Sequence, residues 1–128
     1  MRWIRSLNVS KSSASALMVT KAEFTSGHFP GKPIIPAVMQ LQALEELGRA
    51  FCGQMRPSGA KGTYALGAVL NARFRSPLTP DTTASLKVTL HSQEGSDFLI
   101  SGLVETTPEP GQKIAEALLR FTLTPNRD

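Results

Sequence analysis

His28 has the most chemically suggestive surroundings of any residue in this chain of 128 residues. It lies in SGHFPGKPIIPAVMQLQALEELG (Ser26–Gly48), where three prolines and two glycines are crowded in front of a mostly apolar segment. A neutral imidazole accepts a proton near neutral pH, and a proline-restricted backbone can hold it in a fixed place, as general-base catalysis requires. A histidine beside proline is also commonly structural, so the pattern alone leaves both roles open.

The other reactive side chains suggest less chemistry. Cys52 has no obvious activating partner, which favours a buried structural thiol, and His91 lies in a probable strand with a surface role. With one cysteine no intrachain disulfide can form, which fits a reducing compartment. The sequence has no phosphate-binding glycine loop, metal-spaced His/Cys set or serine-nucleophile elbow, so we expect no metal site.

The elements around His28 can be predicted from proline and glycine. They indicate a loop over Thr25–Ile35, and Pro36 can open a helix because its missing N–H costs nothing in the first turn. A helix is predicted over Ala37–Cys52, with Gly53 as its end. Four polar residues share one face of it: Gln42, Glu45, Glu46 and Arg49. This face meets either solvent, or a ligand cavity or another subunit.

Five strands complete the expected layout, with Ala14–Phe24 before the loop and four strands after the helix. The later strands are predicted at Thr63–Phe74, Thr83–Ser92, Asp97–Thr106 and Lys113–Leu123. Turn sequences separate them, so they should pair antiparallel. The last segment has helical propensity, but its two-residue alternation favours a strand. A lone apolar helix must pack against such a sheet, which predicts a single α+β domain over residues 1–128.

Composition and charge limit the classes of function. The chain is 41% hydrophobic, enough for one core, and no apolar run approaches the ~20 residues of a membrane span. The N-terminal MRWIRSLNVSKSSASALMV lacks the apolar core of a signal peptide, so we expect a cytoplasmic protein without membrane association. The formal charge of +4 favours an acidic partner. The basic residues are scattered without interleaved aromatics, which argues against nucleic acid.

The segment around His28 resembles the signature Gly-His-Phe-Pro-Gly-x-Pro-x-x-Pro-Gly-Val of the FabA/FabZ-type 3-hydroxyacyl-(acyl carrier protein) dehydratases. The matching residues are Gly27, His28, Phe29, Pro30, Gly31, Pro33, Pro36 and Val38, with Ala37 at the glycine before valine. A second block, NARFRSPLTPD (Asn71–Asp81), is similar to the family's Ala-Arg-Phe-x-x-Pro-x-x-Pro-Gly-Asp. The closing IAEALLRF is similar to the family's final strand.

The resemblance implies the hotdog fold, in which a curled antiparallel sheet wraps around one central helix. It also implies a homodimer with active sites at the subunit interface, sometimes assembled into hexamers. No metal or redox cofactor is implied, and substrates are carried on the phosphopantetheine arm of acyl carrier protein or on coenzyme A. The carrier protein is acidic, so Lys32, Arg73 and Arg75 are candidates to bind it; the alternative is that they are ordinary solubilising charges.

Dehydration of a 3-hydroxyacyl thioester needs a base for the C2 proton, an acid for the departing C3 hydroxyl and stabilisation of the thioester oxygen. The resemblance gives the first role to His28. It gives the last to the N–H of Ala37, at a helix start whose N–H groups lack partners. Phe29, Pro36 and Tyr64 are the other substrate-binding candidates, Tyr64 as a residue that lines or gates the acyl tunnel.

The acid is where this chain departs from the family. The resemblance implies a Glu or Asp fourteen positions after His28, contributed to the site across the dimer interface, and this chain has Gln42 there. Its amide can hydrogen-bond a hydroxyl but has no titratable proton to donate. Some relatives, such as those in aryl polyene pathways, also lack the acid. Three sources of the proton remain open: His28 transfers both protons, Glu45 or Glu46 takes over, or a different hotdog subunit supplies the acid. We favour His28 with Gln42 as its hydrogen-bonding partner.

We therefore expect a FabZ-like dehydratase that converts 3-hydroxyacyl thioesters into trans-2-enoyl thioesters in fatty-acid, polyene or polyketide synthesis. Two alternatives remain. One is a non-catalytic hotdog subunit that binds acyl carrier protein or partners an active subunit in a heterodimer. The other is a hotdog acyl thioesterase, in which Gln42 or Glu46 would position the attacking water.

Overall fold

A single helix and one sheet make up the described part of the chain. The computed structural model describes residues 4–21, 34–57, 59, 61–108 and 111–124. The elements in these ranges are β1 Ile4–Val9, β2 Ser13–Val19, α1 Ala37–Met55, β3 Thr63–Phe74, β4 Thr83–Glu94, β5 Asp97–Thr106 and β6 Lys113–Thr124. Among the described residues, no helix has both the length and the apolar character of a membrane span.

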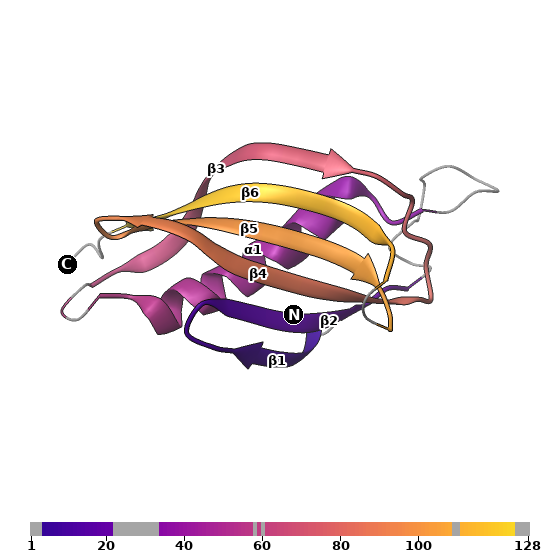
Figure 1. The fold of residues 1–128 in the computed structure, drawn as a ribbon, viewed down its shortest axis with the longest axis horizontal. Coiled ribbons are helices and arrows are strands. Elements are labelled where there is room, and N and C mark those ends of the chain that lie inside the picture. Colours follow the sequence, from indigo (N-terminus) through magenta and orange to yellow (C-terminus); the bar gives the residue numbers. More distant parts are fainter. Residues whose placement is uncertain (1–3, 22–33, 58, 60, 109–110, 125–128) are drawn as a thin grey trace.

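The strands form one antiparallel sheet in the order β1-β2-β4-β5-β6-β3, so β1 and β3 are its two edges. Figure 1 shows the sheet curled over α1, which crosses one face of it. Side chains of a strand point alternately to the two faces, and in β5 the buried positions are Phe98, Ile100, Gly102 and Val104. The expected arrangement, a curled antiparallel sheet around one central helix, is confirmed.

One stripe of α1 is buried against the sheet. Its residues recur with helical spacing: Gln40, Ala43, Leu44, Leu47, Gly48, Phe51 and Cys52. Two glycines allow a close approach of the two layers. A Cβ atom built on Gly48 would lie 2.5 Å from Cζ of Phe121, and one on Gly102 would lie 3.0 Å from a methyl carbon of Leu44. Small residues at these points therefore set how tightly the helix lies on β5 and β6.

The helix begins where the sequence predicts, but its predicted end is wrong. α1 runs to Met55, three residues beyond Cys52, and includes the exposed Gly53. It ends there because Arg56 precedes Pro57, and a residue before proline disfavours helical geometry. Arg56 accordingly has the extended angles φ −55° and ψ 140°. Proline chemistry, rather than glycine, ends this helix.

The N-terminal part holds a strand that the sequence analysis missed. β1 pairs with β2, with a bulge between Arg5 and Asn8 where Ser6 has a φ of 59°. Four consecutive exposed residues, 5–8, remove the alternation that reveals a strand. The predicted strand Ala14–Phe24 is observed as β2, which ends at Val19. Residues 22–24 lie outside the described ranges.

The four strands after the helix begin at the predicted residues. β3 and β5 have the predicted bounds, while β4 extends to Glu94 and β6 to Thr124, slightly beyond the predicted ends. β6 is a strand and not a helix, as its alternation favours, and it lies between β5 and β3.

Candidate active site

The N-terminal end of α1 is exposed. Within the described residues no side chain caps this end, and Pro36, just before the helix, has φ −59° and ψ 145°. Ala37 and Val38 are exposed, Val38 to 62%. The first N–H groups of a helix have no partner within it and carry the positive end of its dipole. This end of α1 can therefore bind an oxygen atom that bears negative charge.

The segment that contains His28 is anchored at both ends by one short connection between β3 and β4. On one side, the N–H of Thr20 donates to the carbonyl of Thr82 (2.9 Å) and the N–H of Asp81 donates to the carbonyl of Thr20 (3.0 Å). On the other, the N–H of Ile35 donates to the carbonyl of Leu78 (2.6 Å). The second family-like block thus has a structural role, because it joins the two ends of the His28 segment beside the start of α1.

Thr20 strengthens this anchor with its side chain. Its Oγ1 accepts the N–H of Thr82 at 3.0 Å and lies 3.1 Å and 2.9 Å from the carbonyl oxygens of Thr79 and Thr82. Thr20 is 1% exposed, so its own hydroxyl is shielded from water and depends on these partners. No local sequence pattern indicates this role, because the partners of Thr20 lie 59 and 62 residues away.

Gln40 is a second residue that the sequence analysis missed. It is 3% exposed, and its Nε2 donates to the carbonyl of Ile35 at 3.4 Å. Its Oε1 receives no hydrogen bond from the described part of the chain. Gln40 therefore ties the first turn of α1 to the backbone that enters the helix. The sequence signal for this role was a glutamine at a position of the helix whose neighbours at helical spacing are apolar.

Gln42 lies on the opposite side of the first turns from Gln40 and is exposed. It follows Ala37 by five residues, a rise of about 7.5 Å along the helix. Its side chain makes no hydrogen bond within the described residues. Gln42 is therefore exposed and available to another molecule, but it is not beside the helix start of its own subunit.

The remaining polar residues of the helical face are engaged with one another. Arg49 forms ion pairs with Glu45 (2.9 Å) and Glu46 (3.3 Å). Both carboxylates thus reach toward the C-terminal end of α1, away from Gln42. Because Arg49 pairs with both carboxylates, neither Glu45 nor Glu46 is well placed to replace the missing acid.

Tyr64 lies near the other end of α1. Its hydroxyl donates to the carbonyl of Ser96 at 2.8 Å, and Arg56 lies over its ring at 5.8 Å. Burial raises the pKa of this hydroxyl. Since a helix of 19 residues is about 28 Å long, Tyr64 is far from Ala37. An acyl chain bound at the helix start would reach Tyr64 only through a tunnel along the whole helix.

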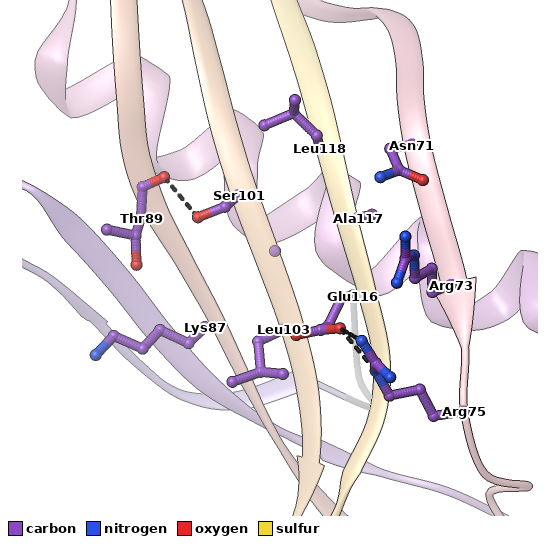
Figure 2. Close-up of a pocket in the computed structure, with 11 residues that line it drawn as sticks. Asn71, Arg73, Arg75, Lys87, Thr89, Ser101, Leu103, Glu116, Ala117 and Leu118 are labelled. Atoms are coloured by element: carbon purple, nitrogen blue, oxygen red, sulfur yellow. Dashed lines mark hydrogen bonds and ion pairs between the residues drawn. The ribbon is translucent and has the colours of Figure 1, made fainter.

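Arg73 and Arg75 lie on the face of the sheet that is turned away from α1. Figure 2 looks onto this face, with the helix behind it. Arg75 forms an ion pair with Glu116 at 2.7 Å, and Lys113 contacts the same carboxylate at 3.1 Å. These two cations hold the pKa of Glu116 below its usual range. The two arginines therefore lie on the opposite face of the sheet from α1.

The other candidates divide into inert and undescribed residues. Cys52 is fully buried, and burial raises its pKa to about 12, so its thiol is not a nucleophile at neutral pH. His91 is exposed on β4. No group of His, Cys, Asp and Glu that suits a metal ion exists among the described residues. His28, Phe29 and Lys32 lie outside the described ranges.

Comparison with known proteins assigns the chain to a family of enzymes. The model of the ApeI-like family, described as ApeI dehydratase, matches residues 8–106. The 3-hydroxyacyl-[acyl-carrier-protein] dehydratase FabZ of Enterococcus faecalis is 33% identical over 97 residues, covering 76% of this chain and 66% of that protein. FabZ of Clostridium acetobutylicum is 34% identical over 98 residues, with the same two shares. This chain spans less than two thirds of the length of these relatives.

Solved structures confirm the hotdog fold. The dehydratase heterocomplex ApeI:P from Xenorhabdus doucetiae contains a chain with a TM-score of 0.67 and 17% identity, covering 88% of each chain. The putative thioesterase yhdA from Lactococcus lactis reaches a TM-score of 0.79 at 12% identity and covers 97% of this chain and 94% of that one. At these identities the likeness extends to the fold.

Proposed function

This chain belongs to the ApeI-like dehydratase family, and we propose that it removes water from 3-hydroxyacyl thioesters to give trans-2-enoyl thioesters. The observation that carries the proposal is the junction of the His28 segment with α1. Both ends of that segment are bonded to the connection 78–82, beside a helix start that no side chain caps. A base and a polarised N–H group within reach of one thioester are what this elimination needs.

In the proposed reaction, His28 takes the C2 proton while the N–H of Ala37 hydrogen-bonds the thioester oxygen. Alanine retains the N–H of the family's glycine, so this role needs no other residue. The electron pair of the C2–H bond forms the C2–C3 double bond as the C3–O bond breaks. The hydroxyl leaves as water once His28 returns the proton to it. Phe29 and Pro36 would flank the thioester.

Gln42 is proposed to hold the leaving hydroxyl and not to protonate it. Its amide is exposed and can accept or donate a hydrogen bond, and we propose that it enters the site of the partner subunit, as the family resemblance implies. The pairing of Glu45 and Glu46 with Arg49 supports His28, rather than either glutamate, as the proton donor.

The proposed substrate is carried on the phosphopantetheine of acyl carrier protein, or on coenzyme A. Support comes from the FabZ relatives, whose names specify acyl-carrier-protein substrates. Arg73 and Arg75, together with Lys32, are proposed to contact the acidic carrier. Tyr64 is proposed to close the far end of the acyl tunnel. Elimination of water is redox-neutral, so the proposal invokes no cofactor, and we assign the reaction to the cytoplasm.

We propose that two hotdog subunits form the working enzyme through the β3 edge. Among the described strands β3 has one neighbour, β6, and it exposes Val69, Leu70 and Phe74, each by more than 40%. An unpaired strand edge with apolar side chains favours strand addition. The partner is a second copy or, because Gln42 replaces the acid, a different hotdog chain. The ApeI:P heterocomplex is a precedent for the second arrangement.

One assay separates dehydration from the two alternatives. The purified chain is incubated with 3-hydroxyacyl-carrier and with saturated acyl-carrier substrates, and the products are identified by mass spectrometry. We expect enoyl thioester from the first substrate and no reaction with the second. Hydrolysis of the saturated thioester would indicate a thioesterase, a function that hotdog neighbours such as yhdA suggest. Carrier binding without either product would indicate a non-catalytic subunit.

A further inference from the structure

A broad groove crosses the face of the sheet opposite α1. It has a volume of about 520 Å³ and is lined by residues of four adjacent strands, β4, β5, β6 and β3. Figure 2 shows Lys87 and Thr89 on one side of it and Asn71, Arg73 and Arg75 on the other. We refer to this feature as the outer groove.

The backbone of Gly102 and Ala117 forms part of the floor of the outer groove, because the side-chain positions of both residues face α1. Gly102 has no side chain, and the direction its Cβ would take leads to Leu44 of α1. Ala117 is 8% exposed and belongs to the buried stripe of β6. The neighbouring Leu103 and Leu118 face outward and are half-buried, so they add an apolar surface to the floor.

The rims of the outer groove are basic and its width suits a helix. Four adjacent strands span three spacings, about 14 Å between the backbones of β4 and β3. An α-helix with its side chains is roughly 10–12 Å across. The lining contains three cations and one carboxylate, Glu116. Arg75 is paired with Glu116, whereas Arg73 and Lys87 form no ion pair within the described residues.

We propose that the outer groove docks an acidic helix of the carrier protein, with carboxylates on the rims and an apolar residue on Leu103 and Leu118. This inference rests on the proposed function, which supplies the acidic partner, and it adds Lys87 and the apolar floor to the contact. One end of the outer groove, at Arg75, is linked through the backbone to the residues that enter α1. The N–H of Arg75 donates to Ile114, and three residues later Leu78 accepts from Ile35, just before Ala37. Through these links Arg75 lies within roughly 25 Å of Ala37.

The test compares Lys87→Glu with Lys11→Glu, the same charge reversal at an exposed residue between β1 and β2. Binding of the apo carrier protein is measured by calorimetric titration against wild type and both variants, with thermal melts to verify folding. We expect Lys87→Glu to raise Kd roughly 3- to 10-fold and to weaken its dependence on salt, because a rim charge acts mainly through screened attraction. Lys11→Glu should bind like wild type. Equal Kd values for the two variants, or no binding by wild type, would overturn the proposal.

Turnover of two substrates distinguishes failure of docking from failure of the proposed function. Lys87→Glu should lower kcat/KM for the 3-hydroxyacyl-carrier substrate by the same factor by which it raises the Kd of the carrier. It should leave kcat/KM for a 3-hydroxyacyl-pantetheine thioester unchanged. Loss on both substrates would contradict docking. If wild type dehydrates neither substrate, the proposed function fails, while the titration still decides whether the outer groove binds the carrier.

Discussion

Oγ1 of Thr20 accepts the backbone N–H of Thr82 at 3.0 Å, and this bond ties the exit of β2 to the start of β4. The His28 segment begins just after Thr20 and returns at Ile35, which is bonded to the same connection. The two ends of the segment are therefore fixed relative to each other and to α1. A catalytic histidine in this segment depends on the anchor for its position.

Replacement of Thr20 by valine should loosen the anchor. The change keeps the shape but removes the hydroxyl, so the N–H of Thr82 loses its side-chain acceptor, at a cost of about 0.5–1.5 kcal/mol in the free energy of unfolding. We expect kcat to fall more than KM rises, since the proposed base loses its position. Urea unfolding and steady-state kinetics measure the two effects. Thr63→Val, at an exposed threonine, is the control; equal behaviour of the two variants would refute the anchor.

Gly48 should not tolerate alanine. The added Cβ would lie 2.5 Å from Cζ of the fully buried Phe121, so the ring or the helix must shift. We expect Gly48→Ala to lower the free energy of unfolding by roughly 1–3 kcal/mol, despite the better helix propensity of alanine.

Gly53→Ala is the matched control, because a Cβ there meets nothing within 4 Å. It should stabilise the protein by about 0.5–1 kcal/mol through reduced freedom of the unfolded chain. If urea unfolding gave both alanine variants the same stability, close packing at Gly48 would not limit the fold.

The β3 edge should determine the oligomeric state. Leu70 is 50% exposed on this edge, and a charge there would be buried without a partner in a β3-to-β3 interface. We expect Leu70→Asp to shift the mass in light scattering from dimer to monomer and to lower turnover. Leu7→Asp, at a residue 56% exposed on β1 at the other edge, should remain dimeric. A dimeric Leu70→Asp would contradict the interface.

Gln42→Glu should raise turnover of 3-hydroxyacyl-carrier substrates, because it restores a proton donor at the position where the family has one. A general acid is typically worth about 10²–10⁴-fold, so at least a tenfold gain is expected. The gain should grow as the pH falls, since the protonated carboxyl is the donor. Gln54→Glu, at an exposed residue near the other end of α1, should leave the rate unchanged. No gain in a folded Gln42→Glu would refute the proposed role of Gln42.

Local patterns predicted the central helix and the later strands because turn residues separate them. The alternation of β5 and the proline before Ala37 placed their boundaries correctly. β1 was missed because its bulge and exposed run erase the alternation. For the site, the proline pattern indicated the helix start. It did not indicate the anchor at Thr20, because the hydrogen bonds of Thr20 join residues that are 59 and 62 positions apart. Such long-range bonds depend on the sheet order, which local patterns do not determine.

The most direct test of the account compares wild type with His28→Ala on a 3-hydroxyacyl-carrier substrate, with carrier binding measured in parallel. The account predicts that wild type forms the trans-2-enoyl product and that His28→Ala binds the carrier equally but forms no detectable enoyl product. Equal rates of enoyl formation by the two proteins would contradict the account, because the C2 proton would then be removed by another group.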